Sequence, residues 1–218
     1  MEIRDYITTD FKAIDSQDSI ATVKDFFDDL NFSHFPVVEQ GIYIGSISFE
    51  DIENFDNDKK VVDYKYTLGS FFTRTDSIWL EVLEVFAKNH TNLIPVLDEK
   101  NSYVGYYEID DIMSFFHQTP FLKEQGRIIK VKKGVLDYSM SQITQIVESN
   151  NGKLLGLFIS ESDVNSIEIT MKISLGAINE IIQSFRRYNY EIMSEHQEDN
   201  YINSLKERSD YLDKYLNM

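Results

Sequence analysis

The chain of 218 residues contains no cysteine. This absence excludes disulfide bonds, thiolate metal sites and a cysteine nucleophile, and it gives no sign of an oxidising compartment. No apolar run approaches the ~20 residues that cross a bilayer. The N-terminus, Met1-Glu2-Ile3-Arg4-Asp5, lacks the basic and then apolar layout of a signal peptide. The sequence therefore predicts a cytoplasmic protein that does not enter a membrane.

Basic residues are scarce: 21 Lys and Arg oppose 37 Asp and Glu, a formal net charge of −16. The imbalance lies in residues 1–121, which hold 23 acids and 9 bases, whereas residues 122–218 hold 14 acids and 12 bases. A surface this acidic repels phosphate backbones and anionic lipids. We expect no nucleic-acid partner.

The motifs of common enzymes are also missing. The four histidines (His34, His90, His117 and His196) show no metal-ligand spacing, and the chain has no Gly-x-Gly-x-x-Gly, no P-loop and no nucleophile elbow. Clusters of acids leave two interpretations, a divalent-cation site or a solvated acidic helix face. Because no EF-hand spacing is present, we predict neither a metal site nor an enzyme.

The first half contains an internal repeat, the feature to seek first in any sequence. Its landmarks recur at offsets of 58 to 60 residues: Asp18-Ser19-Ile20 with Asp76-Ser77-Ile78, Phe35-Pro36-Val37 with Ile94-Pro95-Val96, Tyr43-Ile44-Gly45 with Tyr103-Val104-Gly105, and Asp51-Ile52 with Asp111-Ile112. In each copy an Asp-Ser pair is placed to cap a helix, and two short apolar strands and a short helix follow. The predicted order of each copy is β-α-β-β-α.

This repeat resembles the CBS module, which occurs in pairs packed about a pseudo-two-fold axis with a cleft on either side. The resemblance covers residues 1–121, with copy one at about 1–55 and copy two at about 62–121. CBS modules that bind adenosine nucleotides carry Gly-x-x-Thr/Ser-x-x-Asp at the end of the second strand, and copy one matches with Gly45, Ser48 and Asp51. The resemblance implies that Asp51 binds the ribose hydroxyls and that Ser48 helps at the phosphate or ribose.

Copy two departs from the pattern because Glu108 stands where Thr or Ser is expected, although Asp111 matches. A second carboxylate there would repel a nucleotide phosphate. We therefore expect one functional cleft and one silent or altered cleft. An alternative for copy one stays open, in which Ser48 and Asp51 only cap the short helix.

Four further residues are candidates for ligand contact: His34, Phe35, Arg4 and Arg74. His34, just before Phe35, could face the cleft, with the alternative that it is an ordinary surface group. Arg4 and Arg74, the only arginines of the first half, could meet a phosphate at the module entrances. So few basic groups favour AMP, adenosine or S-adenosylmethionine over ATP.

The second half has a different pattern. Residues 126–194 read as β-α-β-β-α-β, the ferredoxin-like split βαβ order, and resemble the ACT domain, which often binds amino acids at dimer interfaces. Gly134-Val135-Leu136 falls at that family's first-strand loop, although Lys133 replaces its proline; the glycine could instead serve only a left-handed turn. Residues 195–218 read as a polar connection and a helix. The predicted fold class is α+β.

These observations predict a non-enzymatic regulatory protein, without a certain cofactor, whose CBS cleft takes an adenosine-type effector. This domain order resembles regulators of the acetoin-utilization type. The alternative is a dimerisation or interaction scaffold with no nucleotide ligand. In either case we expect a homodimer and a protein partner that the sequence does not identify.

Overall fold

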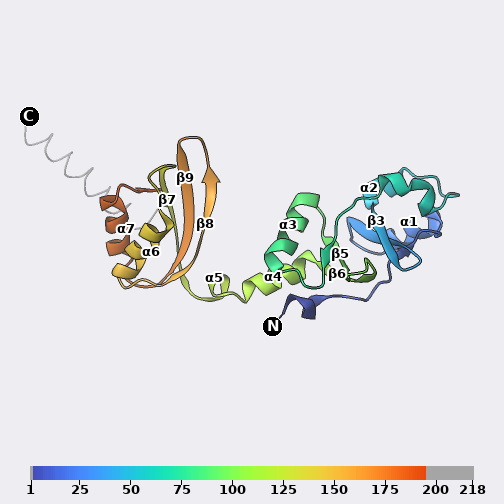
Figure 1. Ribbon diagram of the computed structural model, residues 1–218, viewed down its shortest axis with the longest axis horizontal. Helices are drawn as coiled ribbons and strands as arrows, with labels where there is room; N and C mark the ends of the chain where they lie inside the picture. The colour runs from blue at the N-terminus through green and yellow to red at the C-terminus, as the bar shows by residue number, and fades with distance from the viewer. Residues whose placement is uncertain (1, 195–218) are drawn as a thin grey trace, which may run out of the picture. The chain divides into compact units, whose positions relative to one another are not determined.

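The computed structural model describes residues 2–194, and the chain divides into two compact units between Gln118 and Thr119 (Figure 1). The C-terminal helix predicted within residues 195–218 lies outside the described residues. None of the helices in the described part has both the length and the apolar composition of a membrane span.

The first unit contains two three-stranded sheets with the same internal order, β1-β2-β3 and β4-β5-β6. Each sheet carries two helices, so that both copies have the predicted β-α-β-β-α order. The elements are η1 (Ile3–Tyr6), β1 (Ile14–Asp15), α1 (Ile20–Asp28), β2 (His34–Glu39), β3 (Ile42–Ser48), α2 (Phe49–Glu53), η2 (Val61–Thr67), β4 (Thr73–Arg74), α3 (Trp79–Asn89), β5 (Leu93–Leu97), β6 (Tyr103–Glu108) and α4 (Ile109–His117).

The two copies share even their irregularities. In each, the first strand pairs in parallel with the second, and the second pairs antiparallel with the third. One register shift lies within the proline-containing strand, after Val37 in copy one and after Val96 in copy two. Pro36 lies opposite Ser46, and Pro95 lies opposite Tyr106. The repeat read from the sequence is therefore a structural repeat.

The segment that precedes the first strand of each copy pairs with the other copy's sheet. Thr8 exchanges two backbone hydrogen bonds with Tyr106 of β6, and Gly69 exchanges two with Ser46 of β3. The strand glycines make this close approach possible. A Cβ atom on Gly45 would lie 2.6 Å from Leu68, and one on Gly105 would lie 2.6 Å from Ile7 and from the Thr8 carbonyl. The paired glycines of the repeat thus allow the backbones of the two copies to approach closely enough for these hydrogen bonds.

The helices bury the apolar stripes that the sequence indicated. Ile20, Val23 and Phe27 of α1 are buried, and Ser19 caps this helix by accepting a hydrogen bond from the Thr22 N–H. Copy two differs from the prediction, because α3 begins one residue later, with Ile78 as its N-cap.

The cause of this shift is a different capping arrangement. Ser77 accepts from the Arg74 N–H, at 3.2 Å, and the Glu81 carboxylate accepts from the Ile78 N–H, at 3.1 Å. Pro120 begins a short helix of the second unit, where proline at the first position is favourable.

The second unit follows the predicted β-α-β-β-α-β order after one short helix. Its elements are α5 (Pro120–Lys123), β7 (Gly126–Gly134), α6 (Met140–Ser149), β8 (Leu154–Ser162), β9 (Ser166–Ser174), α7 (Ile178–Arg187) and β10 (Glu191–Ile192). The sheet has the order β10-β7-β9-β8 with antiparallel neighbours.

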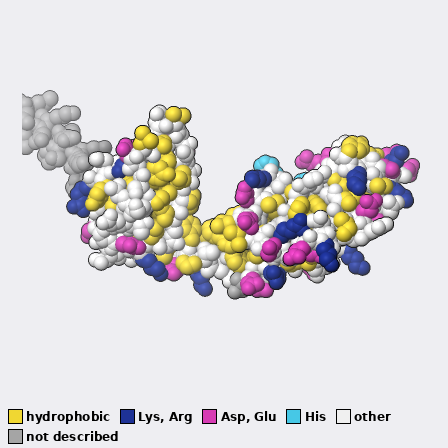
Figure 2. All heavy atoms as spheres, in the orientation of Figure 1, with side chains coloured by type: hydrophobic (Ala, Val, Ile, Leu, Met, Phe, Trp, Pro, Cys, Tyr) yellow, Lys and Arg dark blue, Asp and Glu magenta, His cyan; other side chains and the backbone are white. Residues whose placement is uncertain are grey.

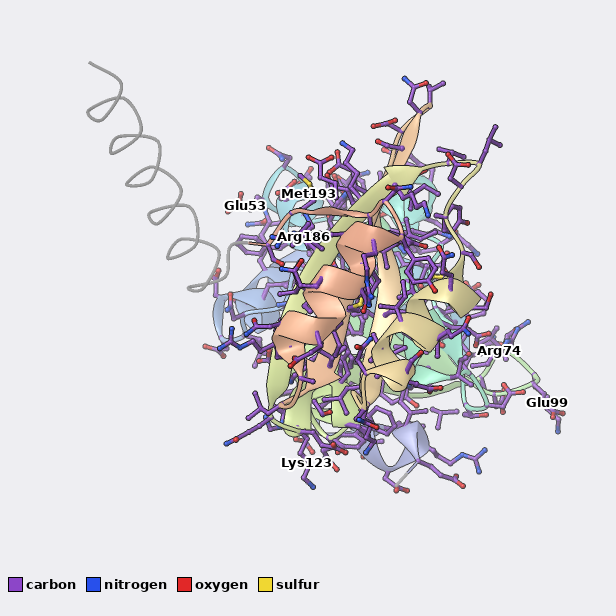
Figure 3. All side chains as sticks on the ribbon, turned by 90° about the vertical axis from the view of Figure 1, so that its left-hand side faces the viewer. Glu53, Arg74, Glu99, Lys123, Arg186 and Met193 are labelled. Atoms are coloured by element: carbon purple, nitrogen blue, oxygen red, sulfur yellow. The ribbon has the colours of Figure 1, made fainter. Side chains whose placement is uncertain are left out.

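Helices α6 and α7 cover one face of this sheet, and Figure 3 looks onto that helix layer. The core between them contains Ile129, Ile143, Ile169 and Phe185, all fully buried. On the other face, Glu168 pairs with Lys130 at 2.8 Å and with Lys132 at 3.8 Å. Hydrophobic side chains also gather along β8 and β9 (Figure 2).

Candidate functional site

A cleft of about 420 Å³ lies in the first unit, at the junction of β3 and α2. Five parts of the chain form it: the start of β2, the end of β3, the first turn of α2, the segment before copy two, and the C-terminal end of α3. Its walls are Ser33, His34, Ser46, Ser48, Phe49, Glu50, Asp51, Thr67, Gly69, Asn89 and His90. The cleft brings together three residues predicted from the sequence: His34, Ser48 and Asp51.

Ser48 and Asp51 have different roles. The Ser48 hydroxyl accepts a hydrogen bond from the Asp51 N–H, at 3.0 Å, and so caps α2. The Asp51 carboxylate has no hydrogen bond or ion pair within residues 2–194, and it is exposed at the cleft. The cap therefore accounts for the serine side chain and leaves the carboxylate of Asp51 available to a ligand.

His34 lies half-buried beside these two residues. Its Nδ1 is 3.1 Å from the Ser33 hydroxyl, and its ring packs edge-on against Phe71, with 5.3 Å between the ring centroids. Burial lowers the pKa of His34, while the charges of Asp51 and Glu50 act in the opposite direction. The ring is therefore mainly neutral at pH 7, when it can both donate and accept a hydrogen bond.

Sequence reasoning missed Asn89 and His90, which reach this cleft from copy two. His90 ends α3 in a left-handed conformation, with φ of 50°, and Asn89 is fixed by a hydrogen bond from its side-chain nitrogen to the Val85 carbonyl. Neither residue belongs to the motif of its own copy. The expected pairing of the two modules was the available signal, because it places the helix end of one copy beside the cleft of the other.

Three other predicted residues lie elsewhere. The Arg74 guanidinium donates to the Asp98 carbonyl and, at 2.7 Å, to Asn101 Oδ1, and it also lies over the Phe72 ring. Arg4 lines a separate hollow of about 350 Å³ with Trp79.

Phe35 is fully buried and packs against Phe26, Phe32 and Tyr106 in the core. None of the residues that line the cleft is a lysine or an arginine.

The equivalent position in copy two is built differently. Tyr106, which corresponds to Ser46, is fully buried and packs against Phe32 and Phe35, so its ring occupies volume that the serine leaves empty. Burial raises the pKa of Tyr106 to about 12, with the nearby charges of Glu108, Asp10 and Asp111 adding to the shift.

Both carboxyl groups of this second position, Glu108 and Asp111, have raised pKa values. Burial first, and then Asp111, Asp110 and Asp10, raise the pKa of Glu108; burial and Asp110 raise that of Asp111, while a hydrogen bond from the Glu108 backbone lowers it. A carboxylate held among others is poorly placed to receive a phosphate.

In the second unit, the loop Gly134-Val135-Leu136 follows β7 directly. Gly134 does not adopt a positive φ, so the left-handed turn considered for it is not present. A Cβ there would lie 3.1 Å from the Asp137 carboxylate, and the Val135 N–H donates to the Asn165 carbonyl. Leu136 is 97% exposed and packs on nothing in the described part of the chain.

Comparison with protein families identifies the first unit. The model of the CBS domain matches residues 3–57 and again residues 71–118, one match for each copy of the repeat. The first unit is therefore a tandem pair of CBS domains. Such pairs are typically regulatory rather than catalytic.

A relative among curated proteins is an uncharacterised protein of Methanocaldococcus jannaschii, 24% identical over 151 residues. The match covers 69% of this chain but 57% of that protein.

Two of the solved structures that resemble this chain each cover about half of it. A CBS domain pair/ACT domain protein from Thermotoga maritima is 20% identical, with a TM-score of 0.49 over 53% of this chain and 96% of that one. The protein CBSX2 in complex with AMP is 14% identical, with a TM-score of 0.46 over 54% of this chain and 96% of that one.

Proposed function

We propose that the cleft of copy one binds an adenosine-type ligand and that the protein is a regulatory sensor. The observation that supports this most directly is the exposed Asp51 carboxylate, which has no hydrogen-bond partner within residues 2–194 and stands at the wall of a 420 Å³ cleft. An ionised carboxylate forms strong charge-assisted hydrogen bonds with the two hydroxyls of a ribose. The α2 cap by Ser48 fixes the backbone that carries Asp51.

The charges of the cleft narrow the ligand class. The cleft walls contain Glu50 and Asp51 and, besides the mainly neutral His34, one further group that can become positive, His90. Triphosphates need several positive charges or a metal ion, whereas AMP, adenosine and S-adenosylmethionine need fewer. We therefore place ATP below these three in affinity.

Calorimetric titration of the full chain with adenosine, AMP, ATP and S-adenosylmethionine tests this function. We expect saturable binding of adenosine, AMP or S-adenosylmethionine, with one site per chain. Thermal melting gives an independent readout, since ligand at 100 times its Kd adds about 2.7 kcal/mol to the apparent stability. Absence of binding by all four would contradict the proposal.

That negative result would favour the alternative, an interaction scaffold without a nucleotide. One observation supports the alternative: the Ser48 hydroxyl already caps α2, so the match to the nucleotide-binding pattern has a purely structural reason at this position.

The second unit supports a related proposal, that it is an ACT-like regulatory domain. Its split βαβ order and its strand order β10-β7-β9-β8 support the assignment.

We also propose that the protein is a homodimer and that it passes the effector signal on to a protein partner. Such a signal requires that the effector bind two conformations of the protein with different affinity. Light scattering should give twice the 25.5 kDa chain mass.

A further inference from the structure

A polar groove runs between α6 and α7 on the helix layer of the second unit, the layer seen in Figure 3. Its volume is about 230 Å³, and a wider hollow shares Asn150 and Arg187 with it. The walls are mostly amides and hydroxyls, with one charged group: Gln142, Gln145, Ser149, Asn150, Ser184 and Arg187. The groove is separate from the Gly134–Leu136 loop, since no loop residue lines it.

A buried serine organises the groove. Ser184 is 2% exposed, and its hydroxyl accepts hydrogen bonds from Arg187 Nη2, at 2.7 Å, and from Asn150 Nδ2, at 3.1 Å. Asn150 also donates to the Ile146 carbonyl, at 2.7 Å. These contacts fix the Arg187 guanidinium and the Asn150 amide against a rigid helix pair.

The guanidinium keeps most of its binding capacity. Arginine has five N–H donors, and within residues 2–194 Ser184 is the one hydrogen-bond partner of Arg187, with no carboxylate paired to it. A second cation approaches the same groove, since Lys133 Nζ donates to Gln142 Oε1, at 3.3 Å, and to the Tyr188 carbonyl, at 2.9 Å.

The acid nearest in sequence on α7, Glu180, lines only the wider hollow. It stands seven residues before Arg187 on α7, which corresponds to about 10 Å along the helix. None of the residues that line the narrow groove is acidic, so Arg187 is the one charged residue of its walls, in a protein whose net charge is −16.

We propose that this groove binds a small oxyanion, a carboxylate or phosphate group held by the fork of Arg187. A planar guanidinium matches both groups with two parallel hydrogen bonds. The amides of Gln142 and Gln145 donate to or accept from the rest of the ligand. The groove is smaller than the roughly 300–1,000 Å³ of sites for drug-sized ligands, which restricts the occupant to a small metabolite.

Nuclear magnetic resonance titration of the full chain with sodium phosphate and with sodium succinate, at constant ionic strength set by sodium chloride, tests the site. We expect saturable shifts at residues 142–150 and 184–188 with at least one of the two anions. Shifts with phosphate alone assign a phosphate ligand, and shifts with succinate alone assign a carboxylate. Shifts that chloride reproduces would overturn the proposal.

Two matched variants locate the contact. Arg187→Gln should weaken binding at least 10-fold, whereas Arg186→Gln, which removes the same charge one residue earlier, should leave it nearly unchanged. Arg187→Lys should recover only part of the affinity, because an ammonium lacks the fork. Equal losses in Arg186→Gln and Arg187→Gln would show a general charge effect and refute the site. Circular dichroism melting checks that each variant folds.

Discussion

The two CBS copies have the same backbone plan but differ where a ligand would lie. Copy one presents small hydroxyl residues, Ser46 and Ser48, around an open cleft with Asp51 at its wall. Copy two replaces them with Tyr106 and Glu108. The first replacement fills volume and the second adds negative charge, so two independent changes oppose a nucleotide at the same place.

The features that assemble the pair recur in both copies, whereas the side chains at the two equivalent ligand positions differ. The paired glycines and the reciprocal backbone bonds of Thr8 and Gly69 recur because each sheet receives the other copy's flanking segment there. The hydrogen bonds of Ser46 and Tyr106 in that packing come from backbone atoms, so the side chains at these two positions can differ. A ligand site can therefore be retained in one copy and lost in the other at little cost in stability.

The largest expected effect separates the two equivalent aspartates. Asp51→Ala should weaken binding of the adenosine-type ligand about 10- to 150-fold, since charge-assisted hydrogen bonds contribute about 1.5–3 kcal/mol. Asp111→Ala, the same change in copy two, should alter affinity less than about twofold. Calorimetric titration of both variants measures the difference.

Melting without ligand provides the control, because Asp51 lies in the first turn of α2, where a carboxylate favours the helix. Equal affinity in wild type and Asp51→Ala would refute the assigned contact. Equal losses in the two variants would show that the clefts are not functionally different.

The next effect tests charge alone. Ser48→Asp gives copy one a carboxylate where copy two has Glu108, and aspartate caps a helix about as well as serine does. Stability should change little, while affinity for AMP should fall by about tenfold and affinity for uncharged adenosine should fall less. Ser48→Ala, which loses the cap, should instead cost about 1 kcal/mol of stability.

Measured side by side, the two ligands distinguish repulsion of a phosphate from damage to the site. If adenosine and AMP lose equal affinity in Ser48→Asp, electrostatic repulsion is not the reason that copy two is altered.

The sequence was sufficient for the repeat, because residue types that control backbone shape recur at nearly fixed offsets. The resemblance of Gly45, Ser48 and Asp51 to the CBS pattern also implied that Ser48 and Asp51 lie at one cleft, and both residues line it. The sequence could not place Arg4 or Arg74, whose long side chains follow tertiary partners such as Thr75 and Asn101.

Two further residues, His90 and Phe35, were also misplaced by the sequence interpretation, each for a different reason. His90 enters the cleft because the helix end of copy two meets the sheet of copy one, and no local pattern marks this. Phe35 looked like a cleft residue from its place beside His34, but successive strand side chains alternate between faces, and its ring points into the core.

A smaller effect concerns stability in copy two. Because burial and neighbouring acids raise the pKa of Glu108, the folded protein binds this proton more tightly than the unfolded chain does. The ionised carboxylate of Glu108 therefore lowers the free energy of unfolding at neutral pH. This loss of stability disappears as the pH falls towards the ordinary carboxyl pKa of about 4.

Glu108→Gln should therefore raise the melting temperature at pH 7 by about 1–2 °C, with the difference vanishing near pH 4. Glu53→Gln, at the end of α2, serves as a matched control and should not stabilise the protein. A melting temperature of Glu108→Gln at or below that of wild type at pH 7 would contradict a strained carboxyl cluster in copy two.

The smallest effect has the opposite sign and belongs to copy one. Because burial lowers the pKa of His34, the folded protein binds fewer protons at this ring near pH 6.5 than the unfolded chain does. The free energy of unfolding should fall as the pH drops from 7 towards 5.5, and His34→Gln should reduce that slope. Urea midpoints measured from pH 7 to pH 5.5 test this. Parallel plots of midpoint against pH for wild type and His34→Gln would show that the His34 ring is not desolvated. The pH dependence of stability would then not distinguish the two clefts.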